Sequence, residues 1–586
     1  MTAKQKRRKR PARQTVEPTE VPRAESIGLF ANATLGWSLF SAVAVWLAFA
    51  PVGWWVLAWI APFGWLRVIN MPELPGKRPY QKIAIAAYVH WLVMIHWVAL
   101  PCIPAAVGMF FLAAYLAIYL VGFIALSRWL VHRAGWSSVI AAPVAWVAME
   151  ALRSYLFTGF ALCSLSHSQV NFVPVMQIAK YTGAYGVSFV VMFVAAAFER
   201  SFFRGSNDVE PRRAARWIPL IASVLVLAAV VGFGVLSTRS DTNQDVGEIA
   251  GAARVAIVQG SLDTEFGSEK AKLERQNTAF QQYLYESEKV TRSQRIDLVV
   301  WPESMFRYDE ISYDEEIAGE KLVPDFYTFR DWSELNAANR KKWVLDFRTK
   351  CLLGTGTEHY RKDGVDRYNT AGFYDTSGEQ VDAYHKMHPV MFGEYIPLGD
   401  VLPWLYSFTP LPGGLMRGKE AKSFDAAGVA FVPNICFENT VPHLIRNQIR
   451  TLHDRGERAD VLVTLTNDGW FWGSALLDLH LACGIYRSVE NGLPMLIAAN
   501  TGFSAHIDRH GRVLQKGPRR ASKVLVTEVQ ALLPQQARQT FYTRFGDVFA
   551  GANLLLACVG VAIGRRRPTE PDAEANVAER SAQETQ

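Results

Sequence analysis

Three short motifs in the second half of this 586-residue chain contain residue types that can perform covalent catalysis. Glu303 follows a Trp-Pro pair, Lys386 follows a Tyr-His pair, and Cys436 is followed by Phe437 and Glu438. A thiol can attack a carbonyl carbon, a carboxylate can take the thiol proton, and an ammonium can stabilise the oxyanion that forms. The three motifs together therefore predict acyl transfer through a covalent intermediate.

Each of these residues alone is a weak signal. A lone cysteine at a strand end is usually a core residue, and a lone glutamate or lysine is usually a solvated surface charge. The three contexts in one chain are harder to dismiss. The other cysteines form no CxxC pair and no zinc-type cluster with histidine, so neither a disulfide framework nor a metal site is expected for Cys102, Cys163, Cys351, Cys483 and Cys558.

Short apolar runs rich in β-branched residues are predicted to form the strands that position these motifs, at 254–259, 297–301, 461–465 and 494–498. Charged, helix-compatible stretches such as 268–291 and 474–491 lie between them. Fully apolar strands alternating with helices indicate a sheet buried on both faces, and hence an α/β layer fold. The long, charged and aromatic-rich segment 305–350 has no assigned place in this scheme.

The first half of the chain has the composition of a membrane domain. Half of all residues are hydrophobic while a fifth are charged, which indicates a membrane bundle joined to a soluble domain. A helix needs ~20 mainly apolar residues to span the hydrocarbon core. Eight stretches are candidates: 28–50, 52–69, 82–100, 104–131, 137–157, 184–202, 217–237 and 544–564.

The basic residues between these stretches predict the orientation of the chain. The N-terminal tail and the loops 70–81, 128–133 and 200–216 are rich in Lys and Arg, which places them in the cytoplasm. Seven crossings then put the chain after about residue 240 outside, and the eighth returns Arg565 to the cytoplasm. The formal net charge of +7 is thus interpreted as a topology signal rather than nucleic-acid binding.

The predicted order is a disordered basic cytoplasmic tail, a seven-helix bundle, a catalytic α/β domain, an eighth transmembrane helix and a second disordered tail, at 1–27, 28–240, 250–535, 541–565 and 566–586. Glu150 and Arg153 lie near the outer end of the fifth span, where ionisable groups are costly unless paired or facing water. Two interpretations remain open for this pair: mutual neutralisation, or contact with a lipid headgroup.

The motifs also carry a family resemblance. The second half of the chain resembles the nitrilase, or carbon-nitrogen hydrolase, superfamily, and the chain from about 28 to 564 resembles the apolipoprotein N-acyltransferase family. The residues that carry it are Trp301-Pro302-Glu303, Lys386, Phe392-Gly393-Glu394-Tyr395-Ile396-Pro397, Cys436-Phe437-Glu438, Thr466-Asn467-Asp468-Gly469-Trp470-Phe471, Asn500-Thr501-Gly502, Thr543-Arg544-Phe545-Gly546-Asp547, Trp146, Glu150, Arg153, Gln177, Gly183 and Ser188.

The resemblance implies an α-β-β-α sandwich outside a bacterial inner membrane. It further implies that Glu303 is the general base, that Lys386 stabilises the oxyanion, and that Cys436 is acylated. Glu394, Glu438 and Phe437 would support these residues. The acyl donor would be a phospholipid and the acceptor a diacylglyceryl-cysteine lipoprotein, with no metal or organic cofactor. We also expect Lys386 to favour the thiolate form of Cys436.

The sequence departs from the family pattern at four places, one of which is the unusual length of the segment 305–350. The segment 263–268 lacks the Gln and the Lys-Trp pair that usually follow Gln259-Gly260, Phe437 replaces a common Tyr, and Met391 replaces a common Pro. These changes leave Glu303, Lys386 and Cys436 intact. They put the donor headgroup and acceptor preference in question.

Three other functions compete with acyl transfer to a lipoprotein. A membrane-tethered nitrilase-type amidase would use the same residues and pass the acyl group to water. A catalytically dead lipid-binding module would be expected to have lost at least one of the three residues, and a transporter would be expected to show internal repeats. Aromatic residues favour lipid contact over an open, polar amidase site: Trp301, Phe306, Trp404, Tyr406 and Phe408. The alternative interpretation, which does not exclude the first, is that they pack the domain onto the membrane.

Overall fold

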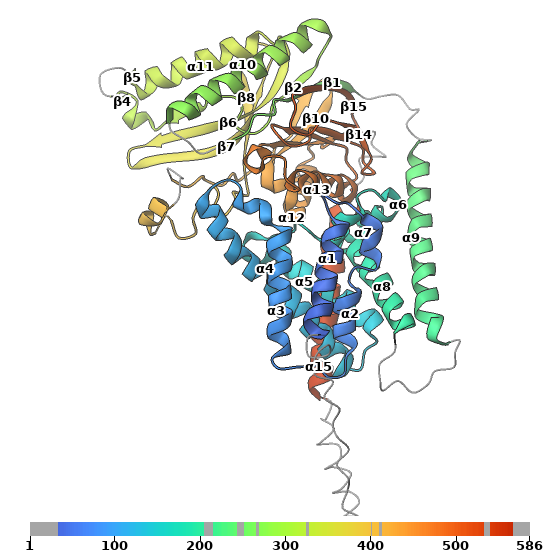
Figure 1. The fold of residues 1–586 in the computed structure, drawn as a ribbon. Coiled ribbons are helices and arrows are strands. Elements are labelled where there is room, and N and C mark those ends of the chain that lie inside the picture. The colour runs from blue at the N-terminus through green and yellow to red at the C-terminus, as the bar shows by residue number, and fades with distance from the viewer. Residues whose placement is uncertain are drawn as a thin grey trace, which may run out of the picture.

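The computed structural model describes residues 33–203, 215–242, 251–264, 269–323, 327–399, 401–408, 413–532 and 539–566. A helical half and an α/β half are stacked on one another (Figure 1). The first predicted tail lies outside the described residues, as does the second beyond Arg566. The segment 265–268, which contains most of the departure from the family pattern, also lies outside them.

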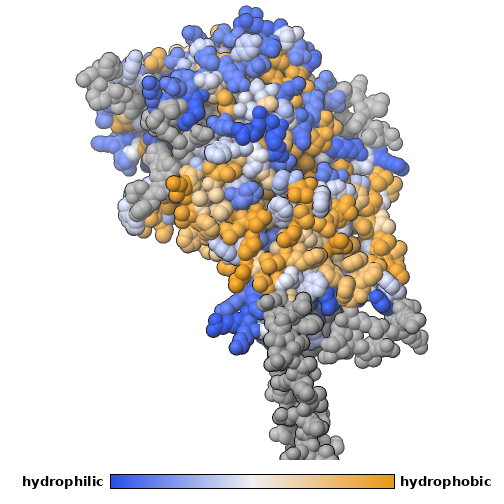
Figure 2. All heavy atoms as spheres, in the orientation of Figure 1, coloured by the Kyte–Doolittle hydropathy of each residue, from blue (hydrophilic) through white to orange (hydrophobic). Residues whose placement is uncertain are grey.

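The helical half is a membrane bundle. Five helices of the described chain are long and apolar enough to cross a membrane: α4 (Ile103–His132), α5 (Ser138–Tyr155), α8 (Ala184–Phe202), α9 (Ile218–Thr242) and α15 (Val548–Arg566). Figure 2 shows the hydrophobic residues as a broad band over these helices, with hydrophilic residues on the α/β half above it. The chain is therefore a membrane protein.

Three of the eight predicted spans differ from single long helices. The helices α1 (Ala33–Ala48) and α3 (Pro79–Met94) have 16 residues each. The segment 52–69 forms two short helices, η1 (Trp55–Trp59) and α2 (Phe63–Asn70), so the prediction of one continuous spanning helix there is wrong. Pro62 lies at the junction, where a proline has no N–H to continue the first helix.

The α/β half contains two mixed sheets. In the described residues the first has the order β15-β1-β2-β6-β7-β8 with β3 beside β6, and the second has the order β14-β13-β12-β11-β10-β9. The first comprises β1 (Ala252–Gln259), β2 (Leu298–Val300), β3 (Glu310–Tyr313), β6 (Lys350–Arg361), β7 (Gly364–Tyr374), β8 (Gln380–His385) and β15 (Lys523–Gln530). The second comprises β9 (Phe424–Ala426), β10 (Val429–Ile435), β11 (Val461–Thr466), β12 (Met495–Ala499), β13 (Ala505–Ile507) and β14 (Val513–Lys516).

The two sheets pack face to face between two helical layers. A core that includes Val255, Leu298, Phe431 and Leu465 fills the space between the sheets. The helices α10 (Glu269–Ser293) and α11 (Phe329–Leu345) cover one outer face, while α12 (Pro442–Asp454) and α13 (Leu476–Asn491) cover the face toward the bundle (Figure 1). This is the α-β-β-α sandwich that the resemblance implied.

The unassigned segment 305–350 extends the first sheet. It contains β3, the short strands β4 (Lys321–Val323) and β5 (Tyr327–Thr328), and α11. Asp309 joins it to the sheet, because its Oδ1 accepts a hydrogen bond of 2.8 Å from the backbone N–H of Gly356. Thr328 caps α11 through reciprocal hydrogen bonds with Asp331.

Helix α13 fixes the sandwich to the bundle. Its Tyr486 hydroxyl donates to the carbonyl of Ser166 at 2.7 Å, and Glu490 Oε1 accepts from the first N–H of α8, at Ala184, at 2.9 Å. Short helices complete the junction: η4 (Leu165–Gln169), α6 (Val173–Met176), α7 (Ala179–Thr182) and α14 (Phe541–Phe545). The strand ends on this side of the sandwich therefore lie close to the membrane half.

Candidate active site

The ends of three strands bring Glu303, Lys386 and Cys436 together. Glu303 follows β2, Lys386 follows β8, and Cys436 follows β10. The Nζ of Lys386 lies 3.3 Å from Glu303 Oε1, and the Cys436 thiol interacts electrostatically with both groups. Glu303 and Cys436 lie more than 130 positions apart in the sequence, and the two sheets bring all three residues into one site.

Hydrogen bonds fix both oxygens of the Glu303 carboxylate. Oε1 accepts from the side-chain amide of Asn369 at 2.6 Å as well as from Lys386, and Oε2 accepts from the backbone N–H of Asn467 at 3.0 Å. The residue is 7% exposed. This arrangement holds the carboxylate in one orientation, and its charge acts on the Cys436 thiol.

Lys386 lies between two carboxylates. Its Nζ is 2.7 Å from Glu394 Oε1 and 3.3 Å from Glu303 Oε1, and its side chain is 1% exposed. Burial acts to lower the pKa of Lys386, but the two carboxylates outweigh it and raise the pKa well above its ordinary value. The side chain is thus a fixed ammonium whose charge remains throughout the neutral pH range.

Cys436 lies at a sharp turn at the end of β10. Its backbone φ is +53°, in the left-handed region that non-glycine residues rarely adopt, and η8 (Cys436–Thr440) begins there. Burial and the negative charge of Glu303 raise the pKa of Cys436 well above its ordinary value, although Lys386 acts to lower it. Lys386 thus favours the thiolate, as expected, but burial and Glu303 outweigh its effect on the pKa of the thiol.

Glu394 and Asn369 complete the surroundings of Lys386. Glu394 Oε2 accepts from the backbone N–H of Val390 at 2.8 Å, and its Oε1 accepts from Asn369 at 3.3 Å in addition to Lys386. Asn369 therefore donates to both carboxylates from β7. Its own carbonyl oxygen, Oδ1, is buried without a hydrogen-bond partner.

Glu438 connects the strand ends that carry Lys386 and Cys436. It is fully buried; Oε1 accepts from the backbone N–H groups of Met387 and His388 at 2.6 and 3.0 Å. Oε2 accepts from the N–H of Ile435 at 2.7 Å and from the Tyr384 hydroxyl at 2.9 Å. Burial raises the pKa of Glu438 while these hydrogen bonds oppose that shift. Glu438 therefore positions the two strand ends relative to each other.

The side of the site toward the bundle is apolar. Phe437 packs on the membrane core cluster and stacks on His388, with ring centroids 5.9 Å apart. Trp301 and Phe306, which the sequence suggested as lipid contacts, are 0% and 1% exposed and pack inside the sandwich. Neither lipid contact nor packing of the domain onto the membrane is therefore correct for those two residues.

The loop after Lys386 exposes large apolar side chains. Phe392, Leu398, Val401 and Trp404 are 67%, 68%, 74% and 59% exposed. Glu394, which contacts Lys386, belongs to the same loop. An exposed apolar group of this kind is typical of a surface that meets lipid or a partner.

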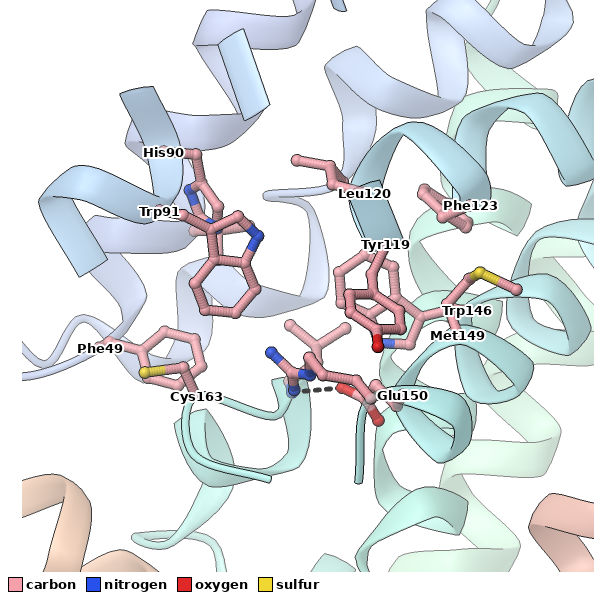
Figure 3. A pocket seen from close by; sticks show the side chains of 13 residues that line it. Phe49, His90, Trp91, Tyr119, Leu120, Phe123, Trp146, Met149, Glu150 and Cys163 are labelled. Atoms are coloured by element: carbon pink, nitrogen blue, oxygen red, sulfur yellow. Dashed lines mark hydrogen bonds between the residues drawn. The ribbon is translucent and has the colours of Figure 1, made fainter. Parts of the chain in front are cut away.

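Glu150 and Arg153 line a pocket inside the bundle together with His90, Trp91 and Tyr119 (Figure 3). Arg153 donates to the Ser164 hydroxyl at 3.2 Å, and its guanidinium lies 5.0 Å from the centre of the Trp91 ring. Glu150 Oε1 accepts from the N–H of Leu165 at 2.8 Å, while Oε2 is buried without a partner. The two groups also interact electrostatically with each other, and one carboxylate oxygen has no hydrogen-bond partner.

Two parts of the site were not predicted as functional. Asn369 carries no local motif, and only its position on β7 brings it to the two carboxylates. His480 lies on α13, where its ring contacts the Asp468 carboxylate and the backbone carbonyl of Cys436. Asp468 belongs to a motif that carried the family resemblance, whereas His480 lies 44 residues from Cys436.

Family models match both halves of the chain. The model described as carbon-nitrogen hydrolase matches residues 254–539, and the model described as apolipoprotein N-acyltransferase N-terminal domain matches residues 41–197. The fold and the site thus define a membrane-embedded member of the carbon-nitrogen hydrolase superfamily.

Whole-chain relatives specify the family further. An apolipoprotein N-acyltransferase of Rhodopirellula baltica is 30% identical, covering 87% of this chain and 93% of the relative. One of Geobacter metallireducens is also 30% identical, covering 87% of this chain and 92% of the relative. The chain belongs to the apolipoprotein N-acyltransferase family.

Solved structures resemble the α/β half. A Saccharomyces cerevisiae member of branch 10 of the nitrilase superfamily has a TM-score of 0.34 at 16% identity, covering 51% of this chain and 95% of its own. An amidase from Nesterenkonia sp. has a TM-score of 0.32 at 14% identity, covering 52% of this chain and 98% of its own.

Proposed function

We propose that this enzyme transfers an acyl chain from a membrane phospholipid to the N-terminal amino group of a diacylglyceryl-cysteine apolipoprotein, through a thioester on Cys436. The observation that carries the proposal is the buried contact of Glu303 with Lys386 beside the Cys436 thiol, at the end of the sandwich that meets the bundle. The family membership supplies the substrate class.

In the first half-reaction the Cys436 sulfur attacks the ester carbonyl of the phospholipid. Because the thiol is protonated, Glu303 accepts its proton as the C–S bond forms. Lys386 stabilises the negative charge on the carbonyl oxygen. The tetrahedral intermediate then expels the lysophospholipid alkoxide, which takes the proton from Glu303 and leaves as an alcohol.

In the second half-reaction the α-amino group of the lipoprotein attacks the thioester carbonyl. Glu303 accepts a proton from the attacking nitrogen, and Lys386 stabilises the second oxyanion. The C–S bond breaks, and the thiolate of Cys436 takes the proton back from Glu303. The products are an amide and the original thiol, so the cycle closes without a cofactor.

We assign supporting roles to three neighbouring residues. Glu394 holds the Lys386 ammonium at 2.7 Å, and Glu438 holds the backbone next to Lys386 and Cys436. Phe437 forms the apolar boundary toward the bundle. The exposed apolar side chains of the loop 392–404 offer acyl chains a path to the site, which supports a lipid substrate over the small amide of a hydrolase.

The same proposal places the sandwich outside the cytoplasmic membrane. Helix α8 begins beside the sandwich at Ala184 and ends near Arg200, and Glu199 there pairs with Arg67 at 2.8 Å. Helix α15 likewise ends in Arg565 and Arg566. The basic residues thus gather at the bundle end remote from the sandwich, which supports a cytoplasmic location for that end.

We propose that Arg153 and Glu150 contact the polar part of a lipid substrate. Changing Arg153→Gln is expected to raise the KM for the phospholipid about ten- to hundredfold with a smaller effect on kcat, because a hydrogen bond from a charged donor contributes about 1.5–3 kcal/mol. Steady-state kinetics in detergent micelles measure this. Arg133→Gln is a matched control, since Arg133 lies over the Trp129 ring at 6.0 Å. An unchanged KM, or loss of folded protein, would contradict the headgroup role.

A product assay tests the function. Purified enzyme is incubated with a phospholipid that carries a labelled acyl chain and with a diacylglyceryl-cysteine peptide. Label in an amide on the peptide supports the proposal, and a peptide with an acetylated amino group serves as the control that accepts no label. Release of the label only as free fatty acid would overturn the proposal in favour of a hydrolase.

A further inference from the structure

The imidazole of His480 bridges two groups that both act as hydrogen-bond acceptors. Its Nδ1 lies 2.9 Å from Asp468 Oδ1, and its Nε2 lies 3.0 Å from the backbone carbonyl oxygen of Cys436. A carbonyl oxygen has no proton to donate. A neutral imidazole carries only one N–H, so it can satisfy only one of these two contacts.

Asp468 is a buried hydrogen-bond acceptor. Its Oδ1 also accepts a hydrogen bond of 3.0 Å from the Thr466 hydroxyl, and the residue is 3% exposed. The carboxylate is closely packed as well: a Cβ added at Gly502 would lie 2.2 Å from Asp468 Oδ2. The ring of His480 therefore faces a fixed anion on one side and a fixed carbonyl on the other.

We propose that His480 is a positively charged positioning residue whose two N–H groups join Asp468 to the carbonyl of Cys436 and so hold the nucleophile in its strained conformation. The proposal rests on the proposed function, because it takes Cys436 as the nucleophile. The φ of +53° at Cys436 needs such an external restraint. Because C=O and N–H point in opposite directions across a trans peptide, the bond also fixes the Phe437 N–H.

The surrounding charges favour the cationic ring. Burial acts to lower the pKa of His480, but the Asp468 carboxylate outweighs it, and the pKa is raised. The backbone carbonyl of Cys436, in η8, and the Glu303 carboxylate, after β2, also act on the ring, and both raise its pKa. On α13 itself, the nearby Asp478 pairs with Arg519, and Arg487 pairs with Glu490.

The sign of the pH dependence follows from the raised pKa. The charged ring and its second hydrogen bond are present below that pKa and are lost as the pH rises through it. Acylation of Cys436 should therefore fall on the alkaline side. The fall in acylation rate at high pH forms the alkaline limb of the pH–rate profile. In Asp468→Asn the neutral amide removes the adjacent anion, so this alkaline limb should move about one to three pH units toward acid.

The test follows single-turnover acylation of Cys436 by intact mass between pH 5 and 10. In Asp468→Asn, we expect the alkaline limb to shift toward acid and acylation to be recovered at low pH. In His480→Gln, we expect the limb to be lost and the acylation rate at neutral pH to be about 10²-fold lower. Asp478→Asn, which alters a surface carboxylate near His480, should behave like wild type. A limb unchanged in Asp468→Asn, or retained in His480→Gln, overturns the proposal.

A second readout does not depend on activity. Full-length enzyme with ¹⁵N-labelled histidine is compared by NMR with His480→Gln to identify the ring signals of His480. Two protonated ring nitrogens at pH 7 support the charged state, and one unprotonated nitrogen overturns it. If wild type fails to acylate Cys436 at any pH while both nitrogens are protonated, the proposed function fails and the charge state of His480 stands.

Discussion

Lys386→Met is expected to abolish acyl transfer and to destabilise the α/β domain. The oxyanion loses its fixed ammonium, and loss of one such stabilising group costs about 10²–10³ in rate. The carboxylates of Glu303 and Glu394, now 3.3 and 2.7 Å from an ammonium, would be left without a counterion. Breaking a buried pair in this way costs about 3–5 kcal/mol in the free energy of unfolding.

The pH dependence of the loss of stability shows whether the unpaired carboxylates cause it. Carboxylates without their cation can take up protons in acid, so the variant should approach wild-type stability as the pH falls and lose stability as the pH rises. Thermal unfolding at several pH values measures the difference. Lys422→Met is a matched control, because Lys422 forms a more exposed pair with Asp382 at 3.1 Å. Near-wild-type activity in Lys386→Met would contradict the site assignment.

Glu303→Gln is expected to lower the rate of Cys436 acylation about 10²–10⁴-fold at neutral pH. The thiol is protonated because its pKa is raised, so the reaction depends on a base beside it. The amide keeps the shape of the carboxylate but cannot take the proton. Below the pH at which His480 loses its charge, the residual rate should increase with pH as the thiol ionises without assistance, which single-turnover measurements from pH 6 upward can follow.

Glu310→Gln provides the comparison for this variant. Glu310 lies in the same sheet, and its Oε2 accepts hydrogen bonds from Thr357 at 3.2 Å and Gln380 at 2.8 Å. Within the described residues, it forms no hydrogen bond with Glu303, Lys386 or Cys436. We expect wild-type acylation in Glu310→Gln. A wild-type rate in Glu303→Gln would show that another group takes the proton.

The strands of the α/β fold could be predicted from the sequence, because the residue patterns that indicate strands are local. Runs of apolar β-branched residues predicted β1, β2, β11 and β12, and each proposed catalytic residue lies within three residues of the end of a strand. The family resemblance supplied the pairing of two sheets, which periodicity alone does not determine. Pro62 indicates that the segment 52–69 is divided into two helices, but the hydropathy of the whole segment favoured one spanning helix.

Features that depend on long-range contacts could not be predicted in this way. Asn369 reaches Glu303 across 66 residues, and His480 reaches Cys436 across 44. The balance of charges around Cys436 could not be predicted for the same reason. Lys386 was considered with Cys436 alone, whereas the folded site also places Glu303 and Glu394 around that single ammonium.

The most direct test of the account is the intact mass of the enzyme after incubation with phospholipid alone. The account predicts one added acyl chain, removable by hydroxylamine, in wild type and in Cys558→Ala, whose exposed thiol lies in α15. It predicts no added mass in Cys436→Ala, and loss of the adduct from wild type when a diacylglyceryl-cysteine peptide is supplied. An acyl adduct that persists in Cys436→Ala would contradict the central claim that this thiol carries the acyl group.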